Sequence, residues 1–590
     1  MKLVRGLNAC VPRWEARRVK RRHLLAGAVI AVVGAGGAAW LYSRSRASQA
    51  LGGGPFQPYP FDPVTPLNFQ QKLFIPVASG PFGLLDVTGP LKIRATAASF
   101  TLLPGQESPF LLYQTEHAGK AYQNPILRIE SGSRFSASLE NALAEPTIIH
   151  WHGLRVPAAM DGHPSTAIAP GGRFDYDFTV KDRGGTYWYH THAHGLTAKQ
   201  AYNGLASYFL VEDNDQRNLA KALDLQLGVT DLPLVLQDKR FNAQGKLLYQ
   251  PNPMDAMMGW LGDIVLTNLT PNAVLSVSPR SYRFRLLNGS NARIYRLAFV
   301  KDTTALEFTV IGTDGGLIER PETVTEAFLS PGERLDVVFD AGQAQPGADL
   351  FLKSLAFDPM ENEGMGGGMS GMPGMSGQSG MQGTSGMQSM PGMNHGTGLT
   401  GGMGQMMAGT GSSRLAAGLE FNLLKLSIAA GERVAAKLPG ALSKINPIRT
   451  DGATERKIDL SMDMMRFLIN GKSFNMQEIV FDVQRGAVEI WNIQNPAIGM
   501  PHPIHLHGFP FQVLERLNSP APLAAGARFG KGRTVSDLGW KDTVLVWPGE
   551  TVRLAIDFAH DFPGSQTYVF HCHNLEHADA GMMINFRVLA

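Results

Sequence analysis

Ten of the chain's 16 histidines stand in four short windows whose spacing suits metal binding. The windows are His150-Trp151-His152, His190-Thr191-His192, His502-Pro503-Ile504-His505-Leu506-His507, and His571-Cys572-His573 continuing to His577. Side chains at positions i and i+2 of a β-strand point to the same face, so the pairs 150/152, 190/192, 505/507 and 571/573 would each present two adjacent imidazoles. Imidazole ligands without a carboxylate suit copper better than calcium or magnesium. The pattern therefore predicts bound copper.

Cys572 lies between His571 and His573 and must point to the opposite face of the same strand. There it can meet His502, His577 and Met582. Two histidines, one cysteine and a weak axial methionine are the ligands of blue-copper electron-transfer sites. The backbone of residues 571–573 would then join this second site to the histidine pairs. A small buried hydrophobe is the alternative for Cys572, and its neighbours make that the weaker hypothesis.

In combination, these motifs resemble those of the three-domain multicopper oxidases, and the similarity extends over essentially the whole mature chain. The resemblance implies a type 1 copper held by His502, Cys572, His577 and Met582, and a type 2 copper held by His150 and His505. It implies a type 3 pair held by His152, His190, His192, His507, His571 and His573, and hence four coppers per chain. Such an enzyme collects single electrons and reduces O2 to two waters. Asp161 resembles the family's acidic neighbour of the type 2 site, which would supply protons; a turn residue before Gly162 is the equal alternative.

A methionine-rich segment bears on the electron donor. Residues 360–407 hold 12 of the chain's 24 methionines among Gly, Ser and Gln, which predicts a flexible insert in the second domain. Thioethers are soft ligands that select Cu(I), and the resemblance narrows to copper-resistance, cuprous-oxidase-type members, which carry such inserts. Further candidates for a substrate Cu(I) site are Met360, Met462, Asp463, Met464, Met465 and Met500. Ordinary core packing is the alternative for these methionines.

Two departures from the cuprous oxidases keep other functions open. The insert lies in the second domain rather than the third, and Ile498 and Ala578 stand where that subgroup tends to have acidic residues. A laccase-like oxidase of phenols or aromatic amines is therefore the second hypothesis. The third is a copper-binding or structural periplasmic protein without oxidase activity, and the complete set of ten histidines, Cys572 and Met582 argues against it.

The elements that must position these ligands are short β-strands. β-branched and aromatic runs alternate with Gly, Pro, Asn and Asp turns from about Phe56 onward, which predicts an all-β chain. A turn followed by an alternating strand recurs at Pro170-Gly171, Pro331-Gly332 and Pro548-Gly549, and only the first and third copies lead to histidines. We expect three domains at 57–213, 214–440 and 455–590. The resemblance implies cupredoxin-like Greek-key β-sandwiches, with a three-copper cluster between the first and third.

The first fifty residues differ from the rest of the chain. They hold ten of the 53 Lys and Arg residues and one of the 50 Asp and Glu residues, so the remainder is net negative, which argues against nucleic-acid binding. Arg21-Arg22 and the apolar run from Leu24 to Tyr42 resemble a twin-arginine export signal, which implies an encounter with the export machinery and a periplasmic or otherwise exported protein. A membrane anchor at residues 24–42 is the alternative. Two cysteines exclude a disulfide framework, and we expect a monomer.

Overall fold

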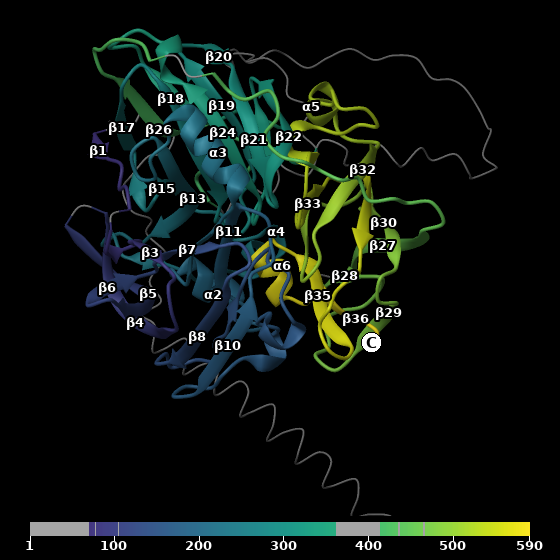
Figure 1. Cartoon of the computed structure of the whole chain (residues 1–590). Helices are drawn as coiled ribbons and strands as arrows, with labels where there is room; N and C mark the ends of the chain where they lie inside the picture. Colours follow the sequence, from purple (N-terminus) through teal and green to yellow (C-terminus); the bar gives the residue numbers. More distant parts are fainter. Residues whose placement is uncertain (1–69, 77, 104, 361–412, 435–436, 464–465) are drawn as a thin grey trace, which may run out of the picture. The chain divides into compact units, whose positions relative to one another are not determined.

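In the computed structural model, the described residues are 70–76, 78–103, 105–360, 413–434, 437–463 and 466–590, and their strands form six β-sheets (Figure 1). The sheets belong to three cupredoxin-like β-sandwich domains, so the predicted fold class is confirmed. The predicted export signal, Met464, Met465 and all of the methionine-rich insert except Met360 lie outside the described residues. A search of the described part of the chain finds no helix with the length and apolar character needed to span a membrane.

The first domain packs a six-stranded sheet on a five-stranded sheet. The order of the first sheet is β10 (Arg173–Thr179), β8 (Arg134–Asn141), β4 (Leu91–Leu103), β5 (Gln106–His117), β6 (Lys120–Gln123) and β2 (Gly80–Pro81). The order of the second sheet is β3 (Leu84–Asp86), β7 (Ile126–Glu130), β12 (Ala206–Glu212), β11 (Gly185–Thr191) and β9 (Ile149–His150). Buried and exposed residues alternate along β10, whereas every residue of β11 is buried. β11 is therefore covered on both faces.

The second domain packs an eight-stranded sheet on a seven-stranded sheet. The first sheet has β14 (Leu247–Leu248) beside β13 and the order β16 (Thr270–Pro271), β15 (Ile264–Thr267), β13 (Asp231–Phe241), β18 (Ser281–Asn288), β24 (Arg334–Asp340), β21 (Phe308–Thr313) and β22 (Gly316–Val324). The second sheet has β23 (Ala327–Leu329) beside β19 and the order β1 (Gln71–Lys72), β17 (Ala273–Val277), β26 (Phe421–Ile428), β25 (Leu350–Ser354), β19 (Tyr295–Lys301) and β20 (Thr304–Leu306). β1 thus precedes every strand of the first domain's two sheets in the chain but pairs with a strand of the second domain. β25 and β26, which flank the methionine-rich insert, are antiparallel neighbours.

The third domain packs two five-stranded sheets. The order of the first is β28 (Arg466–Ile469), β27 (Thr454–Asp463), β30 (Val488–Gln494), β34 (Thr551–Asp557) and β32 (Phe511–Leu517). The order of the second is β29 (Ile479–Val483), β36 (Met583–Val588), β35 (Gln566–Cys572), β31 (His502–Leu506) and β33 (Thr543–Val546). Side chains of both sheets form one buried cluster, which includes Trp491, Phe570 and Cys572. Cys572 therefore faces the inside of the sandwich, as its place in the strand predicted.

Short helices connect the strands. They are α2 (Thr197–Tyr202), α3 (Asn214–Leu223), α4 (Pro253–Met258), α5 (Ala521–Ala525) and α6 (Leu575–Asp579). α6 follows β35 directly and carries His577. α4 belongs to the second domain in sequence but contacts α6 of the third, and Figure 1 shows the two helices side by side.

Candidate metal centre

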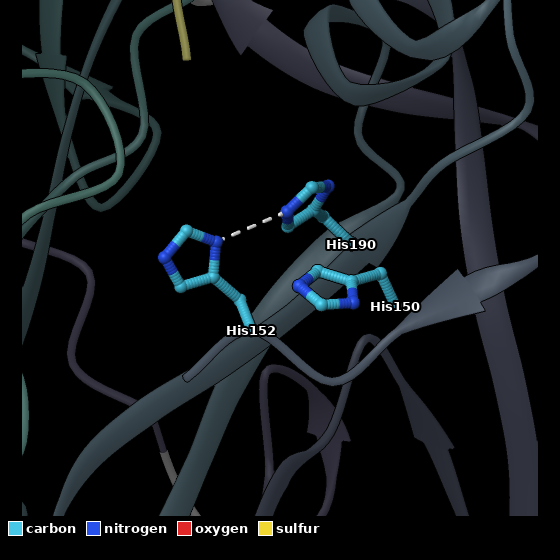
Figure 2. Close-up of side chains that lie close together, drawn as sticks. All are labelled: His150, His152 and His190. Atoms are coloured by element: carbon cyan, nitrogen blue, oxygen red, sulfur yellow. Dashed lines mark hydrogen bonds between the residues drawn. The ribbon is translucent and has the colours of Figure 1, made fainter. Parts of the chain in front are cut away.

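Strand register brings the histidine windows of the first and third domains together. β9 and β11 pair with His150 opposite His190, and β31 and β35 pair with His505 opposite His571. Figure 2 shows His150 and His190 converging with His152, which follows β9. Across the two domains, the Nε2 atom of His150 lies 3.3 Å from the Nε2 atom of His505. All eight histidines of the four His-x-His pairs are buried.

His150 and His505 each use one ring nitrogen to bind a protein acceptor, and this hydrogen bond determines which nitrogen faces the interior of the cluster. His150 Nδ1 donates to the backbone carbonyl of Asp161 at 2.7 Å, and His505 Nδ1 donates to the backbone carbonyl of Asp542 at 2.8 Å. A carbonyl oxygen only accepts, so each ring carries its proton on Nδ1 and presents the lone pair of Nε2 to the other ring. Two lone pairs 3.3 Å apart repel each other. A cation bound by both would convert this repulsion into attraction.

Elsewhere in the same cluster, two more imidazole nitrogens face each other with their lone pairs. His571 Nδ1 donates to the carbonyl of Cys572 at 2.9 Å, and His507 Nδ1 donates to the carboxylate of Asp161 at 2.7 Å. The Nε2 atoms of His507 and His571 are therefore both acceptors, and they lie 3.1 Å apart. His192 Nε2 lies 3.3 Å from the Nε2 atom of His571, so three imidazoles converge on this point.

The third pair uses opposite nitrogens of its two rings. His190 Nδ1 donates to the carbonyl of Thr191 at 2.8 Å, whereas His152 donates through Nε2 to the carboxylate of Asp542 at 2.9 Å. The inward lone pairs are therefore His190 Nε2 and His152 Nδ1, which are 3.4 Å apart and are joined by the dashed line in Figure 2. His573 lies against both rings, and neither of its nitrogens has a hydrogen-bond partner among the described residues.

These observations test whether the cluster fits metal ions, and it does. Burial lowers the pKa of His571 to about 4, and it also lowers the pKa of His152, His190, His192, His505, His507 and His573. These imidazoles are therefore neutral at pH 7, as metal ligands must be. Carbonyl and carboxylate acceptors that bind the second ring N–H, and so fix the ring tautomer, are a regular feature of metal-binding histidines. An all-imidazole donor set fits copper, as the sequence predicted.

A separate group of side chains surrounds Cys572. The Nδ1 atoms of His502 and His577 lie 3.6 and 3.7 Å from its Sγ atom. His577 Nε2 donates to the backbone carbonyl of Met257 at 2.9 Å, which leaves His577 Nδ1 as a lone pair aimed toward the sulfur. Met582 is fully buried, and its carbonyl accepts from the Cys572 amide at 3.0 Å. The donor set of two histidines, a cysteine and a nearby methionine fits blue copper.

The electrostatics of this second group also fit a metal. Burial raises the pKa of the Cys572 thiol, and burial lowers the pKa of His577 to about 3. Without a metal, both groups are therefore neutral at pH 7. A bound cation would stabilise the thiolate, because metal binding displaces the thiol proton. The ring of Phe467 stacks on His577 with centroids 3.8 Å apart and covers one face of it.

Asp161 is both a turn residue and a neighbour of the cluster. It ends the short 3₁₀ turn of residues 158–160 and is fully buried. Its Oδ2 atom accepts from His507 and its carbonyl accepts from His150. Its Oδ1 atom lies 3.4 Å from His150 Nδ1 and has no hydrogen-bond partner in the described part of the chain. The two readings of Asp161 from the sequence are therefore compatible.

Sequence analysis missed Asp542 and the ion network behind it. The guanidinium of Arg334, at the start of β24 in the second domain, binds the Asp542 carboxylate with Nη1 2.8 Å from Oδ1. Lys541 lies 2.9 Å from both Asp314 and Glu333. All five side chains are buried. Arg334 and Asp542 are 208 positions apart, so no local sequence motif predicts their contact.

Two glycines make room for this network and for the ring of His573. Gly153 follows His152 with φ +89, and a Cβ there would lie 2.4 Å from Asp542 Oδ2. Gly332 has φ +85, and a Cβ there would lie 2.9 Å from the ring of His573. Both positions need a left-handed backbone without a side chain. The second domain, which carries no histidine pair, thus touches the cluster through Gly332 and Arg334.

The residues predicted to bind substrate Cu(I) lie at several separate places in the fold, unlike the two groups of copper ligands. Met462 is exposed on β27 and pairs with Phe467, whose ring stacks on His577. Asp463 forms an ion pair with Arg466. Met500 and Met360 are half-buried, and the Met360 amide donates to Asp358. Of the two departures from the cuprous oxidases, Ile498 is 76% exposed and Ala578 is buried in α6.

Comparisons with known proteins cover all three domains. Family models described as multicopper oxidase match residues 114–216, 213–353 and 448–590. The multicopper oxidase mco of Staphylococcus aureus is 28% identical over 467 residues, which cover 79% of this chain and 81% of that protein. The crystal structure of McoA multicopper oxidase from Aquifex aeolicus aligns with a TM-score of 0.73 and 36% identity, covering 88% of this chain and 100% of that one. The cell division protein FtsP of Photorhabdus laumondii is 28% identical over 538 residues, 87% of this chain and 98% of that protein.

Proposed function

The chain belongs to the multicopper oxidase family, as its histidine and cysteine motifs predicted, and we propose that it couples the oxidation of Cu(I) to the reduction of O2. Its family makes it a copper-dependent oxidoreductase with O2 as electron acceptor. The proposal adds the electron donor and a role in copper tolerance. Four Cu(I) ions would each lose one electron, and O2 would take up four electrons and four protons to give two waters.

We assign four coppers to the two groups of ligands. His502, Cys572, His577 and Met582 would hold a type 1 copper, and His150 and His505 a type 2 copper. A type 3 pair would be held by His152, His190, His573, His192, His507 and His571. The observation that carries this assignment is the three pairs of inward lone pairs, one for each copper of the cluster. When bound, these coppers supply the redox chemistry that accepts single electrons and delivers four of them to O2.

The chain's own part in electron transfer is the short backbone around Cys572. The Cys572 sulfur belongs to one group of ligands, while the imidazoles of His571 and His573 belong to the other. An electron received at Cys572 therefore has a covalent path to the cluster through one peptide bond in either direction. The carbonyl of Cys572 also holds His571 in the tautomer that presents Nε2 to the cluster.

Asp161 is the residue that we propose for moving protons to the cluster. Its Oδ2 atom is the acceptor for His507, and its Oδ1 atom, 3.4 Å from His150 Nδ1, has no hydrogen-bond partner in the described residues. That free oxygen can hold a proton close to the site of O2 reduction without breaking the bond to His507. Substitution by Asn should keep the bond to His507 and slow O2 reduction.

Two features support Cu(I) over phenols as the donor. His502 and His577 are both buried, so a bulky phenol cannot lie against either ring. Thioethers of Met500 and Met462, and those of the insert at 360–407, are ligands that favour Cu(I). A laccase-like activity toward phenols or aromatic amines is the alternative, and it predicts rates that do not depend on these methionines.

A structural role without catalysis is the remaining alternative, since FtsP, a cell division protein, is among the relatives. A protein with that role alone has no need for ten buried metal-binding histidines. Each buried polar nitrogen without a partner costs free energy, and among the described residues His192 Nδ1 and both ring nitrogens of His573 have no hydrogen-bond partner. Their retention supports the enzyme hypothesis. We also propose export through the N-terminal signal to the periplasm, and a monomer.

The experiment that tests the proposed donor compares two substrates on two proteins. The full-length copper-loaded protein and a deletion of residues 361–407 are assayed with Cu(I) and with a bulky phenol. We expect the deletion to lower Cu(I) oxidation, mainly at low Cu(I) concentration, and to leave phenol oxidation unchanged or faster. A short turn can join β25 to β26, because loop-closure free energy changes by only about 0.6 kcal/mol per doubling of length. Full-length protein that oxidises the phenol but not Cu(I) would favour the laccase-like alternative.

A further inference from the structure

Helix α4 exposes its apolar residues and buries its charged one. Its sequence is Pro-Met-Asp-Ala-Met-Met. Asp255, its only ionisable residue, is 5% exposed, whereas Met254 and Met258 are 38% and 36% exposed. Soluble proteins normally show the reverse preference, with Asp at the surface and Met inside. Core packing therefore does not account for these two methionines.

The buried side of α4 is fixed by polar contacts. Asp255 accepts from the amide of Asn252 in a capping box and binds Arg240, with Nη2 2.8 Å from Oδ1. Immediately after the helix, the amide of Trp260 donates to Glu576 of α6 at 3.0 Å. These bonds hold α4 against α6 and set the direction in which its other side chains point (Figure 1).

The remaining face of α4 is a group of three thioethers. Met254, Met257 and Met258 have the spacing i, i+3 and i+4, which places all three on one side of a helix. Met257 is half-buried and packs against the hydrophobic core of the third domain, while its two neighbours are open to solvent. Met257 therefore connects the two exposed methionines to the hydrophobic core that contains Cys572.

The backbone of Met257 reaches that group directly. Its carbonyl accepts the Nε2 proton of His577 at 2.9 Å, and His577 Nδ1 lies 3.7 Å from Cys572 Sγ. His577 itself is fully buried. α4 thus covers the outer edge of this imidazole, and a donor outside the protein meets α4 before it can meet His577.

We propose that Met254, Met257 and Met258 form the site that receives substrate Cu(I) and passes its electron to His577. The inference rests on the proposed cuprous oxidase function and names residues for its substrate. Thioether sulfur binds Cu(I) in preference to harder ions, so the site holds the reduced ion and releases the oxidised one. One Cu(I) loses one electron and leaves as Cu(II). The electron enters the group of His502, Cys572 and His577 through the Met257 carbonyl and its hydrogen bond.

The test replaces the thioethers and keeps the backbone. Variants M254L/M258L and M254L/M257L/M258L are made in the full-length protein, because Leu is close to Met in volume and lacks sulfur. The matched control is M476L, a half-buried methionine of the third domain that lies outside α4. Copper content and blue absorbance establish that each protein is folded and loaded.

Two measurements are made on each protein. The first is KM and kcat for Cu(I), compared with ferrocyanide as a one-electron donor that needs no thioether. The second is the affinity of the fully reduced protein for added Cu(I) under anaerobic conditions, from competition with a chromophoric Cu(I) chelator. We expect the triple variant to raise KM for Cu(I) and to weaken anaerobic binding by about tenfold. The double variant should show part of both effects, and M476L neither.

Three outcomes would overturn the proposal. Unchanged KM and unchanged binding in the triple variant, with Cu(I) oxidised normally, would eliminate the α4 site and leave the cuprous oxidase function intact. Equal losses with Cu(I) and ferrocyanide would mean that α4 only holds His577 in place. Absence of Cu(I) oxidation by the unaltered protein would overturn the function and the site together.

Discussion

Substitution of Arg334 by Met should destabilise the protein strongly, although Arg334 is not itself a proposed copper ligand. The buried network contains three carboxylates, of Asp314, Glu333 and Asp542, and two cations, of Arg334 and Lys541. It therefore carries one net negative charge when all five groups are ionised, and R334M doubles that charge. Burial already raises the pKa of Asp314 to about 6. Removing one partner of a buried ion pair costs about 3–5 kcal/mol.

The same substitution should weaken copper binding at one part of the cluster. In the described part of the chain, Arg334 is the residue of the second domain that binds the Asp542 carboxylate, which accepts from His152, so R334M removes the cation that orients it. Loss of such an outer contact typically lowers metal affinity by about 10- to 100-fold. We therefore expect R334M to contain fewer than four coppers per chain while it remains blue, because the ligands around Cys572 do not contact this network.

A double substitution tests the charge argument itself. R334M/D542N leaves two carboxylates and one cation, which restores the original net charge. We expect the double variant to be more stable than the sum of its single substitutions by about 0.5–3 kcal/mol, the usual range for residues in one network. Calorimetry and denaturant unfolding of the copper-free proteins give the stabilities, and elemental analysis gives the copper content. An R334M protein within about 1 kcal/mol of the unaltered protein would refute the reasoning.

Three further outcomes follow from the site. C572S should lose the blue colour and oxidase activity while keeping its fold, because one buried side chain changes; an intense blue band in this variant would contradict the assignment of Cys572. Elemental analysis of the loaded protein should give about four coppers per chain, more if the insert is filled, and a value near one would point to a simple electron carrier. In the copper-free protein, His571 has a pKa of about 4, against about 6.5 in an unfolded chain, so the folded form binds fewer protons between these pH values. Stability should be fully present above pH 6.5 and fall by up to about 3 kcal/mol from this residue as the pH drops to 4, which denaturant unfolding at pH 7 and 4.5 measures; equal stabilities would contradict it.

The sequence predicted features that depend on neighbours along one strand. A spacing of two residues places His571 and His573 on one face and Cys572 on the other in any strand, whatever surrounds it. Turn and strand patterns recur in each domain and predicted the all-β fold, and the histidine and cysteine motifs predicted the family. Both predictions are confirmed.

Features that depend on contacts between segments distant in the chain could not be predicted from the sequence. Asp542 meets His152 and Arg334 only because three domains pack together, and nothing near residue 542 in the sequence marks it. The choice of Nδ1 in His152 and Nε2 in His190 follows from partners that no spacing rule supplies. β1 has two residues, too few to show a period, so its pairing with the second domain was not predicted. The methionines of α4 stand far in sequence from the histidines, and only the contact between Met257 and His577 indicates that they could take part in binding substrate.

The two groups of ligands differ in how much of the polypeptide must be complete before each exists. The ligands around Cys572 all come from residues 502–582, whereas the cluster joins residues 150–192 to residues 505–573 and is buttressed by Arg334. The proposed type 1 copper thus needs only the third sandwich and, from the second, the Met257 carbonyl that fixes the tautomer of His577. The cluster, in contrast, can form only after all three have docked. A blue preparation would therefore report that the last domain is folded and in contact with α4, and only its capacity to consume oxygen would report that assembly is complete.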